Sequence, residues 1–252
     1  MKRILLVSAV SLLLLHVTSA VVAAQEVLQV APFGAVHVYP CEGTPERLIL
    51  FLSGDGGWNT GVDTRSQAMA TLHAVVVGVD INEYTKFLNA SRESCLYPVK
   101  DFIALSEAVR KHLDLKPEIR PILLGYSSGA ALVYAMLVQA PPHTFAGAIS
   151  MGFCPDIPLD KPLCKGEGLE AKPYETKKEK GFVFQPSPLL KDPWLVFQGS
   201  DDEVCTVAEI QAYVKQVPNG EVVNLPEVGH GFRVTRRWLP KFEEAIHRFD
   251  PS

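Results

Sequence analysis

The sequence lacks the motifs that mark metal, nucleotide and nucleic-acid sites. Its five cysteines form no C-x-x-C pair and no cysteine–histidine cluster of zinc type, and no two histidines have metal-ligand spacing. Acidic residues outnumber basic ones by 28 to 24, so the surface would not attract the phosphate backbone of nucleic acid. We therefore expect no metal, no cofactor and no nucleic-acid partner.

No apolar run is as long as the roughly 20 residues that a membrane-spanning helix needs. The N-terminus has a basic start, Met1 to Arg3, then an apolar stretch from Ile4 to Leu15, and small residues that end at Ala24. This order is typical of a signal peptide. It predicts cleavage after Ala24, which leaves a mature chain of residues 25–252 in the periplasm. An uncleaved anchor is the competing interpretation, and the polar start of the mature chain argues against it.

All five cysteines lie in the expected mature chain, and an exported protein meets a compartment in which disulfides persist. An odd number leaves at least one thiol unpaired. Cys154 and Cys164 bracket a short loop, so we expect these two to pair, although sequence alone does not fix the pairing. The other three are Cys41, Cys95 and Cys205.

Short, mostly apolar runs without clean alternation are typical of buried parallel strands, because helices cover both faces of such a sheet. The chain has six of them, at 47–52, 75–79, 122–124, 146–151, 194–198 and 221–225. An expected antiparallel hairpin precedes them, at 26–30 and 35–39. Helical stretches lie between or after the runs, at 64–71, 99–112, 128–139, 207–216 and 239–249. This alternation predicts an α/β fold in one domain, with a doubly wound, mostly parallel sheet.

The stretch 152–190 interrupts this alternation. It is rich in proline, glycine and lysine, and it is longer than a typical connection. Two interpretations remain open at this stage: an ordered excursion or lid over a site, and a solvated surface loop.

The strongest chemical signal is the segment Leu124-Gly125-Tyr126-Ser127-Ser128-Gly129. It places a G-x-S-x-G turn between an apolar strand and a helix. In a nucleophile elbow the serine sits in a strained turn, and the two glycines remove β-carbons that would collide with the neighbouring strand and helix. This context predicts an α/β-hydrolase with Ser127 as nucleophile. A tight turn with a capping serine is the alternative.

A serine hydroxyl needs a base to take its proton, and in this fold the histidine comes last in the chain. His230 fits, because it lies in the segment Val228-Gly229-His230-Gly231-Phe232, just after the last expected strand. The remaining histidines of the mature chain are expected to have surface or packing roles; they are His37, His73, His112, His143 and His247.

An acid after the penultimate strand would orient this histidine and stabilise its charged form. Three carboxylates follow that strand: Asp201, Asp202 and Glu203. The common hydrolase pattern G-x-x-D-x-V selects Asp202, with Asp201 as the alternative.

Acyl transfer also requires hydrogen-bond donors for the oxyanion. The segment 53–58, Ser-Gly-Asp-Gly-Gly-Trp, follows the first central strand, where this fold supplies one such amide. Its glycines let the backbone approach a substrate closely. We assign the oxyanion hole to the amides of Asp55, with Gly56 beside it, and Ser128. A simple glycine-rich turn is the alternative.

These segments resemble the bacterial virulence protein family VirJ/AcvB. The similarity lies in LSGDGGW at 52–58, VGVD at 77–80 and LGYSSGA at 124–130, in that order and at similar spacing, and it covers most of the mature chain. The resemblance implies a periplasmic α/β-hydrolase that acts on aminoacylated phosphatidylglycerol and is linked to secretion-associated virulence. It also implies that the family's catalytic serine and histidine correspond to Ser127 and His230.

A lipid or small ester is the expected partner, with possible contact to the membrane surface and to envelope secretion components. Without the two basic residues of the signal peptide, 22 basic residues face 28 acidic ones, a formal charge of −6. Together with Asp55, Asp201 and Glu203 near the assigned site, this charge would tolerate or favour a cationic substrate. Asp55, Trp58 and Tyr126 are expected to contact it.

Two other functions remain open. The triad specifies the reaction type but not the pocket, so a general carboxylesterase or lipase is the alternative enzyme. A non-catalytic interaction module of an envelope secretion system is the alternative from another class. The complete set of serine, histidine and acid argues against the module, since a purely binding protein has no physical need of it.

Overall fold

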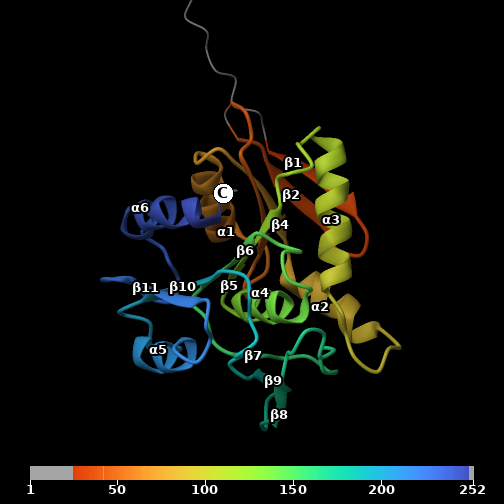
Figure 1. The fold of residues 1–252 in the computed structure, drawn as a ribbon, viewed down its shortest axis with the longest axis vertical. Helices are drawn as coiled ribbons and strands as arrows, with labels where there is room; N and C mark the ends of the chain where they lie inside the picture. Colours follow the sequence, from red (N-terminus) through yellow and green to blue (C-terminus); the bar gives the residue numbers. More distant parts are fainter. Residues whose placement is uncertain (1–24, 42, 250–252) are drawn as a thin grey trace, which may run out of the picture.

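The computed structural model describes residues 25–41 and 43–249, and in this part of the chain an eight-stranded, mostly parallel sheet forms the centre (Figure 1). The strand order is β1-β2-β4-β3-β5-β6-β10-β11, and β2 pairs antiparallel with both β1 and β4. The predicted α/β fold, with a mostly parallel sheet and an antiparallel N-terminal hairpin, is confirmed. The predicted signal peptide, 1–24, lies outside the described residues.

The strands lie close to where the sequence predicts them. They differ from the predicted runs by no more than two residues at either end. Their bounds are β1 (Glu26–Val30), β2 (Gly34–Tyr39), β3 (Arg47–Leu52), β4 (Ala74–Val79), β5 (Pro121–Tyr126), β6 (Gly147–Met151), β10 (Trp194–Gly199) and β11 (Gly220–Leu225).

The helices of the described chain are α1 (Thr60–Ala70), α2 (Ile81–Ala90), α3 (Val99–His112), α4 (Ser128–Gln139), α5 (Val207–Val214) and α6 (Thr235–Ile246). Two of them, α3 and α4, have the predicted bounds. The helix predicted at 64–71 begins four residues earlier, because the side chain of Asn59 accepts hydrogen bonds from the amides of Gly61 and Val62 and caps it there. In the part of the chain that the structure describes, no helix is long and apolar enough to cross a membrane.

Two further helix predictions need correction, and one helix was not predicted. The sequence analysis missed α2, which begins directly after β4 with Asp80 as its capping residue. The helix predicted at 239–249 begins at Thr235 and ends in a 3-10 turn at 247–249, and the one predicted at 207–216 ends two residues earlier. Short amphipathic helices have weak periodicity, so tertiary packing decides their ends.

Helices on both faces of the sheet explain why the central strands lack alternation. In β3, Leu48, Leu50 and Leu52 pack into the core on the side of α3 and α4, whereas Ile49 and Phe51 pack on the side of α1 and α6. All five side chains are fully buried. Burial of such a side chain contributes about 1.5–3 kcal/mol to folding, so each strand is stabilised from both sides.

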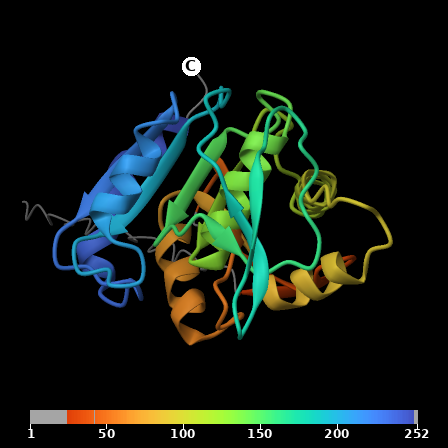
Figure 2. The same ribbon diagram turned by 90° about the horizontal axis from the view of Figure 1, so that it is seen from below.

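The segment 152–190 is an ordered excursion with a small sheet of its own (Figures 1 and 2). Its strands pair antiparallel in the order β7 (Asp156–Ile157), β9 (Lys180–Phe184), β8 (Ala171–Glu175). The strand β7 lies against α4. Apolar side chains of the segment are buried, which excludes the solvated loop; they are Ile157, Leu159, Leu163, Leu169, Phe184 and Leu190.

The predicted disulfide between Cys154 and Cys164 is wrong. Cys95 pairs with Cys164 and Cys154 with Cys205, at Cα separations of 4.9 and 5.8 Å. The excursion folds back against two distant parts of the chain, so each of its cysteines meets a partner from outside it. Cys41 is the unpaired thiol of the described residues.

Candidate active site

Ser127 lies at the point where β5 turns into α4. Its backbone, with φ of 55° and ψ of −122°, is strained for a residue with a β-carbon, and its amide donates a hydrogen bond to the carbonyl of Met151 at 3.0 Å. A β-carbon on Gly125 would lie 2.1 Å from the carbonyl oxygen of Gly129, and one on Gly129 would lie 2.4 Å from that of Ser53. The two glycines therefore permit the close strand–helix contact that the sequence pattern predicts.

His230 reaches Ser127 from the loop after β11. Its Nε2 lies 3.0 Å from Ser127 Oγ, and its side chain is 19% exposed. The guanidinium of Arg65, on α1, donates a hydrogen bond at 2.9 Å to the carbonyl of Gly231 and so fixes the backbone next to the histidine. The backbone beside the ring is thus fixed, while the ring itself remains partly exposed.

Asp202 meets the other ring nitrogen of His230. Its Oδ2 lies 2.8 Å from His230 Nδ1, and its side chain is fully buried. The second oxygen accepts hydrogen bonds from the amides of Val204 at 2.9 Å and Cys205 at 3.2 Å. The alternative acid, Asp201, is exposed and accepts a hydrogen bond from the neighbouring serine. Of the two, the structure therefore places Asp202 on the histidine.

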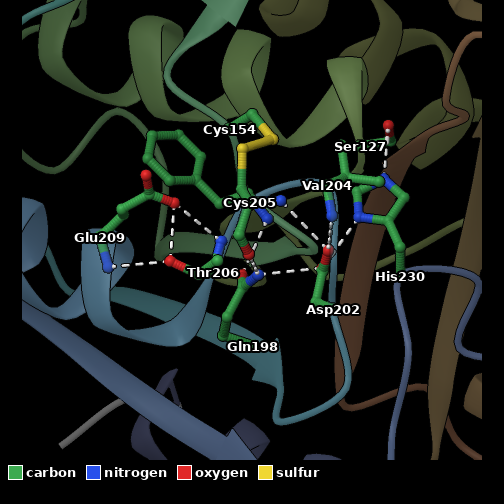
Figure 3. A network of polar contacts seen from close by, with 10 residues as sticks. Ser127, Cys154, Gln198, Asp202, Val204, Cys205, Thr206, Glu209 and His230 are labelled. Carbon is green, nitrogen blue, oxygen red and sulfur yellow. Dashed lines mark hydrogen bonds and ion pairs between the residues drawn. A yellow bond between two sulfur atoms is a disulfide. The ribbon is translucent and has the colours of Figure 1, made fainter.

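The acid loop, residues 200–206 between β10 and α5, is fixed by Gln198 (Figure 3). This fully buried side chain donates from Nε2 to Asp202 Oδ2 at 2.9 Å and to the carbonyl of Cys205 at 2.6 Å. Its Oε1 accepts from the amide of Phe153 at 3.2 Å. The sequence analysis gave Gln198 no role; the available signal was a glutamine at the end of an apolar strand. The disulfide of Cys205 ties the same loop to the chain after β6.

The glycine-rich loop, residues 53–58, passes beside Ser127. A β-carbon on Gly54 would lie 3.0 Å from the Cβ of Ser127, so the backbone here approaches the nucleophile closely. Asp55 follows Gly54 in the chain, so the peptide bond that carries the Asp55 amide lies close to Ser127. Both Asp55 and Gly56 are exposed. This placement is compatible with the oxyanion assignment.

Asp80 holds the glycine-rich loop in place from the end of β4. Its Oδ2 accepts a hydrogen bond from the amide of Trp58 at 2.9 Å, and the hydroxyl of Ser53 accepts one from the amide of Ile81 at 3.0 Å. Asp80 therefore serves both the loop and the cap of α2. The sequence analysis quoted this residue only for its family resemblance.

Ser128 opens α4, so its amide has no acceptor within the helix and is available to a substrate oxygen. Its hydroxyl is buried without a hydrogen-bond partner among the described residues. Its backbone can serve the site, whereas its side chain makes no polar contribution there.

Trp58 was expected to contact substrate, but its side chain packs against the central sheet. Its ring packs against the face of Gly78, where a β-carbon would lie 1.9 Å from the indole. It also stacks on His37 at 4.9 Å and meets Phe51 edge-on at 5.8 Å. The indole therefore anchors the glycine-rich loop to the sheet, and we correct its expected role accordingly.

Tyr126 does lie at the site. Its ring centroid is 5.7 Å from that of His230 and 6.3 Å from that of Phe232, and the guanidinium of Arg65 lies 4.3 Å from it. Burial raises the pKa of the Tyr126 hydroxyl, and the neighbouring Arg65 opposes that rise. The phenol is therefore uncharged at neutral pH, and its ring lines the site beside His230.

Carboxylates of the excursion act on the same region as Asp55. Burial, followed by the charges of Glu179 and Asp55, raises the pKa of Asp156. Burial and the charges of Glu179, Asp156 and Asp55 raise the pKa of Tyr174 to about 12. We call Asp55, Asp156 and Glu179 the acidic rim.

The arrangement can transfer a proton from the serine hydroxyl to an imidazole whose far side meets a buried carboxylate. That combination makes a serine oxygen nucleophilic at neutral pH. Across residues 25–41 and 43–249, no group of three or more histidine, cysteine or acidic side chains is placed to hold a metal ion.

Comparison with known proteins bears on the fold. No family model matches the chain, and no curated protein matches its sequence. Solved structures do match. A soluble variant of monoglyceride lipase from Saccharomyces cerevisiae has a TM-score of 0.63 and 11% identity, over 94% of this chain and 98% of that one.

Two bacterial structures match as well. The esterase domain of a Rhodothermus marinus protein has a TM-score of 0.52 and 16% identity, over 85% of this chain and 92% of that one. An alpha-beta serine hydrolase homologue from Coxiella burnetii has a TM-score of 0.52 and 20% identity, over 92% of this chain and 99% of that one. Likeness at these identities bears on the fold alone, and the fold of this chain is that of the α/β-hydrolases.

Proposed function

We propose that the protein is a serine ester hydrolase that works through an acyl-enzyme, with Ser127 as nucleophile, His230 as general base and Asp202 as orienting acid. The observation that carries this proposal is the unbroken chain of contacts from Ser127 Oγ to His230 Nε2 at 3.0 Å and from His230 Nδ1 to Asp202 Oδ2 at 2.8 Å. The elbow strain at Ser127 supports it, because strained backbone collects at functional sites.

In the first half of the proposed reaction, His230 takes the hydroxyl proton while Ser127 Oγ attacks the ester carbonyl. The amides of Asp55 and Ser128 would donate hydrogen bonds to the resulting oxyanion, and one such donor contributes on the order of 10²–10³ in rate. The tetrahedral intermediate then collapses to the acyl-enzyme. The alcohol leaves with the proton that His230 returns to it.

In the second half, water attacks the acyl-enzyme and gives a proton to His230. A second tetrahedral intermediate collapses, the carboxylic acid leaves, and the proton returns to Ser127 Oγ. Throughout, Asp202 keeps the proton of His230 on Nδ1 and stabilises the imidazolium.

For the substrate we propose aminoacylated phosphatidylglycerol, hydrolysed in the periplasm. The resemblance of the three motif segments to the VirJ/AcvB family supports it. The acidic rim supports it as well, since Asp55, Asp156 and Glu179 offer negative charge to a protonated amine. The two disulfides support an extracytoplasmic location, because disulfides persist in oxidising compartments.

A fluorophosphonate probe tests the nucleophile. The wild-type protein should be labelled, and Ser127→Ala should not. Absence of labelling in folded wild-type protein would favour the interaction module instead.

The substrate is tested by comparing a lysyl or alanyl ester with an uncharged acyl ester of similar size. We expect a higher kcat/KM for the charged ester, with an advantage that shrinks as salt rises. Asp55→Asn should reduce that advantage more than it reduces hydrolysis of the neutral ester. Parallel losses without any salt-dependent preference would favour a general carboxylesterase or lipase, the second candidate, which agrees with the esterase and lipase folds that match the chain.

A further inference from the structure

A cavity of about 400 Å³ is lined by chain neighbours of Ser127 and His230, although not by these two residues themselves. Its wall includes Gly54 and Tyr126, which adjoin Ser127, and Gly231, which adjoins His230. The rest of the wall comes from the glycine-rich loop, from the first turns of α1, from the loop after His230 and from the start of α6. An occupant of this cavity would lie next to the ester that Ser127 attacks.

The charge lining this cavity is positive. Arg65 and Arg233 form part of its wall, and no aspartate or glutamate of the described chain lines it. We call it the arginine pocket. The glycine-rich loop contributes Gly54, Gly56 and Gly57 to its wall but not Asp55, whose charge acts both on Tyr126 and on Asp156 of the excursion.

Arg65 is buried without an acid to balance it. The residue is 6% exposed; its guanidinium donates to the carbonyl of Gly231 and lies over the ring of Tyr126. Both partners are neutral, and the Nε of Arg65 has no hydrogen-bond partner among the described residues. Burial lowers the pKa of this guanidinium. Buried arginines are normally paired with an anion, and no side chain of the described protein supplies one here.

Arg233 approaches the same point from the loop before α6. It is exposed and forms no ion pair within the described chain. A β-carbon on Gly231 would lie 3.3 Å from its Cγ and Nε, which places the side chain against the histidine loop. Burial and the charges of Asp202 and Asp55 raise the pKa of the Tyr126 hydroxyl, whereas the charges of Arg65 and Arg233 both lower it. Two arginines from different elements therefore line the same cavity.

We propose that the arginine pocket binds an anionic group of the ester substrate, a phosphate or a carboxylate, and positions the ester carbonyl over Ser127. A planar guanidinium matches the paired oxygens of both anions. This inference rests on the proposed function, since it assigns the anion to the same molecule as the ester. It adds a second charge requirement, independent of the acidic rim.

The kinetic test uses three esters with one acyl group: a glycerol ester, a glycerophosphodiester and a glycerate ester. We expect kcat/KM to be on the order of tenfold higher for at least one anionic ester than for the glycerol ester, as two charge-assisted contacts imply. Arg233→Gln should remove most of that ratio. Arg236→Gln deletes the same charge outside the pocket and should leave the ratio unchanged. The anionic ester with the higher kcat/KM identifies the preferred anion as phosphate or carboxylate.

Equal kcat/KM values for all three esters would overturn the proposal. So would an equal loss of the anionic-to-neutral ratio of kcat/KM in Arg233→Gln and Arg236→Gln. Arg233 is the residue of choice because it is exposed, so its replacement spares the core. Arg65→Lys retains a charge but not the planar fork, and it should lower the ratio by a smaller factor.

A binding measurement separates this proposal from the proposed function. Ser127→Ala protein is titrated calorimetrically with glycerol 3-phosphate and with glycerate, with and without Arg233→Gln. If the affinity for glycerol 3-phosphate or for glycerate is about tenfold lower in Ser127→Ala/Arg233→Gln than in Ser127→Ala, the pocket is supported, even if no ester is hydrolysed. Ester hydrolysis without Arg233-dependent binding or charge preference would retain the hydrolase and reject the pocket.

Discussion

The nucleophile elbow and the acid loop are built in different ways. At the elbow, β5, Ser127 and α4 are contiguous in sequence, and Gly125 and Gly129 supply the close contacts within a few residues. The acid loop instead depends on Gln198 and on a disulfide to the chain after β6. The position of the serine is therefore encoded locally, whereas that of the acid depends on tertiary contacts.

This difference gives the two regions different sensitivities. Substitution of Ser127 should act on the chemistry, by removing the hydroxyl oxygen. Substitution of Gly125 or Gly129 should act on folding, because an added β-carbon would collide with the backbone. Substitutions around the acid loop should act indirectly, by loosening a buried carboxylate that accepts four hydrogen bonds: from Gln198, Val204, Cys205 and His230.

The largest effect is expected at the elbow. Ser127→Ala should lower kcat by on the order of 10⁶-fold, because no other hydroxyl can replace the nucleophile. Ser128→Ala is the matched control: its hydroxyl has no bonding partner among the described residues, so the rate should change by less than about threefold. Steady-state kinetics with circular dichroism would check both. A reversal of the two effects would show that the elbow has been misassigned.

The second effect is expected at the acid. Asp202→Asn should lower kcat by on the order of 10⁴-fold, since the amide stabilises the wrong histidine tautomer. The exposed Asp201→Asn should stay within about threefold of wild type. Small and equal losses in kcat would place the functional acid elsewhere.

Gln198→Leu tests how far the acid depends on its support. The substitution removes donors to Asp202 and Cys205 and an acceptor for Phe153, so it should lower the free energy of unfolding by about 1–3 kcal/mol. As a positioning effect, it should lower kcat by about 10- to 100-fold with little change in KM, and slow fluorophosphonate labelling. Gln211→Leu, on the exposed side of α5, is the control. A stability loss with an unchanged kcat would make Gln198 purely structural.

The locally encoded elbow could be predicted from the sequence, whereas the parts that depend on tertiary contacts could not. The elbow could be read directly, since strand, turn and helix are adjacent and glycines at two fixed positions have one physical explanation. The bounds of α3 and α4 could also be predicted, because their patterns are long. The choice between Asp201 and Asp202 rested on pattern alone, and only the structure shows which carboxylate is buried against His230.

Other features depend on contacts that no local pattern contains. Cys154 lies closer in sequence to Cys164 than to Cys205, yet the fold brings it to the acid loop. The strands of the excursion have at most five residues, and neither β8 (AKPYE) nor β9 (KGFVF) shows a regular hydrophobic alternation. Trp58 was expected to meet substrate, but Gly78 opens a place for its ring on the sheet.

The smallest effect on activity is expected from the disulfides, which give a direct comparison of two parts of the excursion. Replacing Cys154 and Cys205 by serine, or Cys95 and Cys164 by serine, should lower the free energy of unfolding by about 2–4 kcal/mol in each case. Only the first pair adjoins the acid loop, so only that variant should lose turnover, by several-fold. Equal turnover in both variants would mean that the acid loop holds its shape without the disulfide.

The central claim is that Ser127 forms the acyl-enzyme. It is tested most directly by quenching the protein with acid during turnover of a slowly hydrolysed ester and locating the added acyl mass by peptide mass spectrometry. We predict one acyl group on the peptide that contains Ser127. Hydrolysis that proceeds in the wild type and in Ser127→Ala alike, with no acyl group on this peptide, would contradict the account.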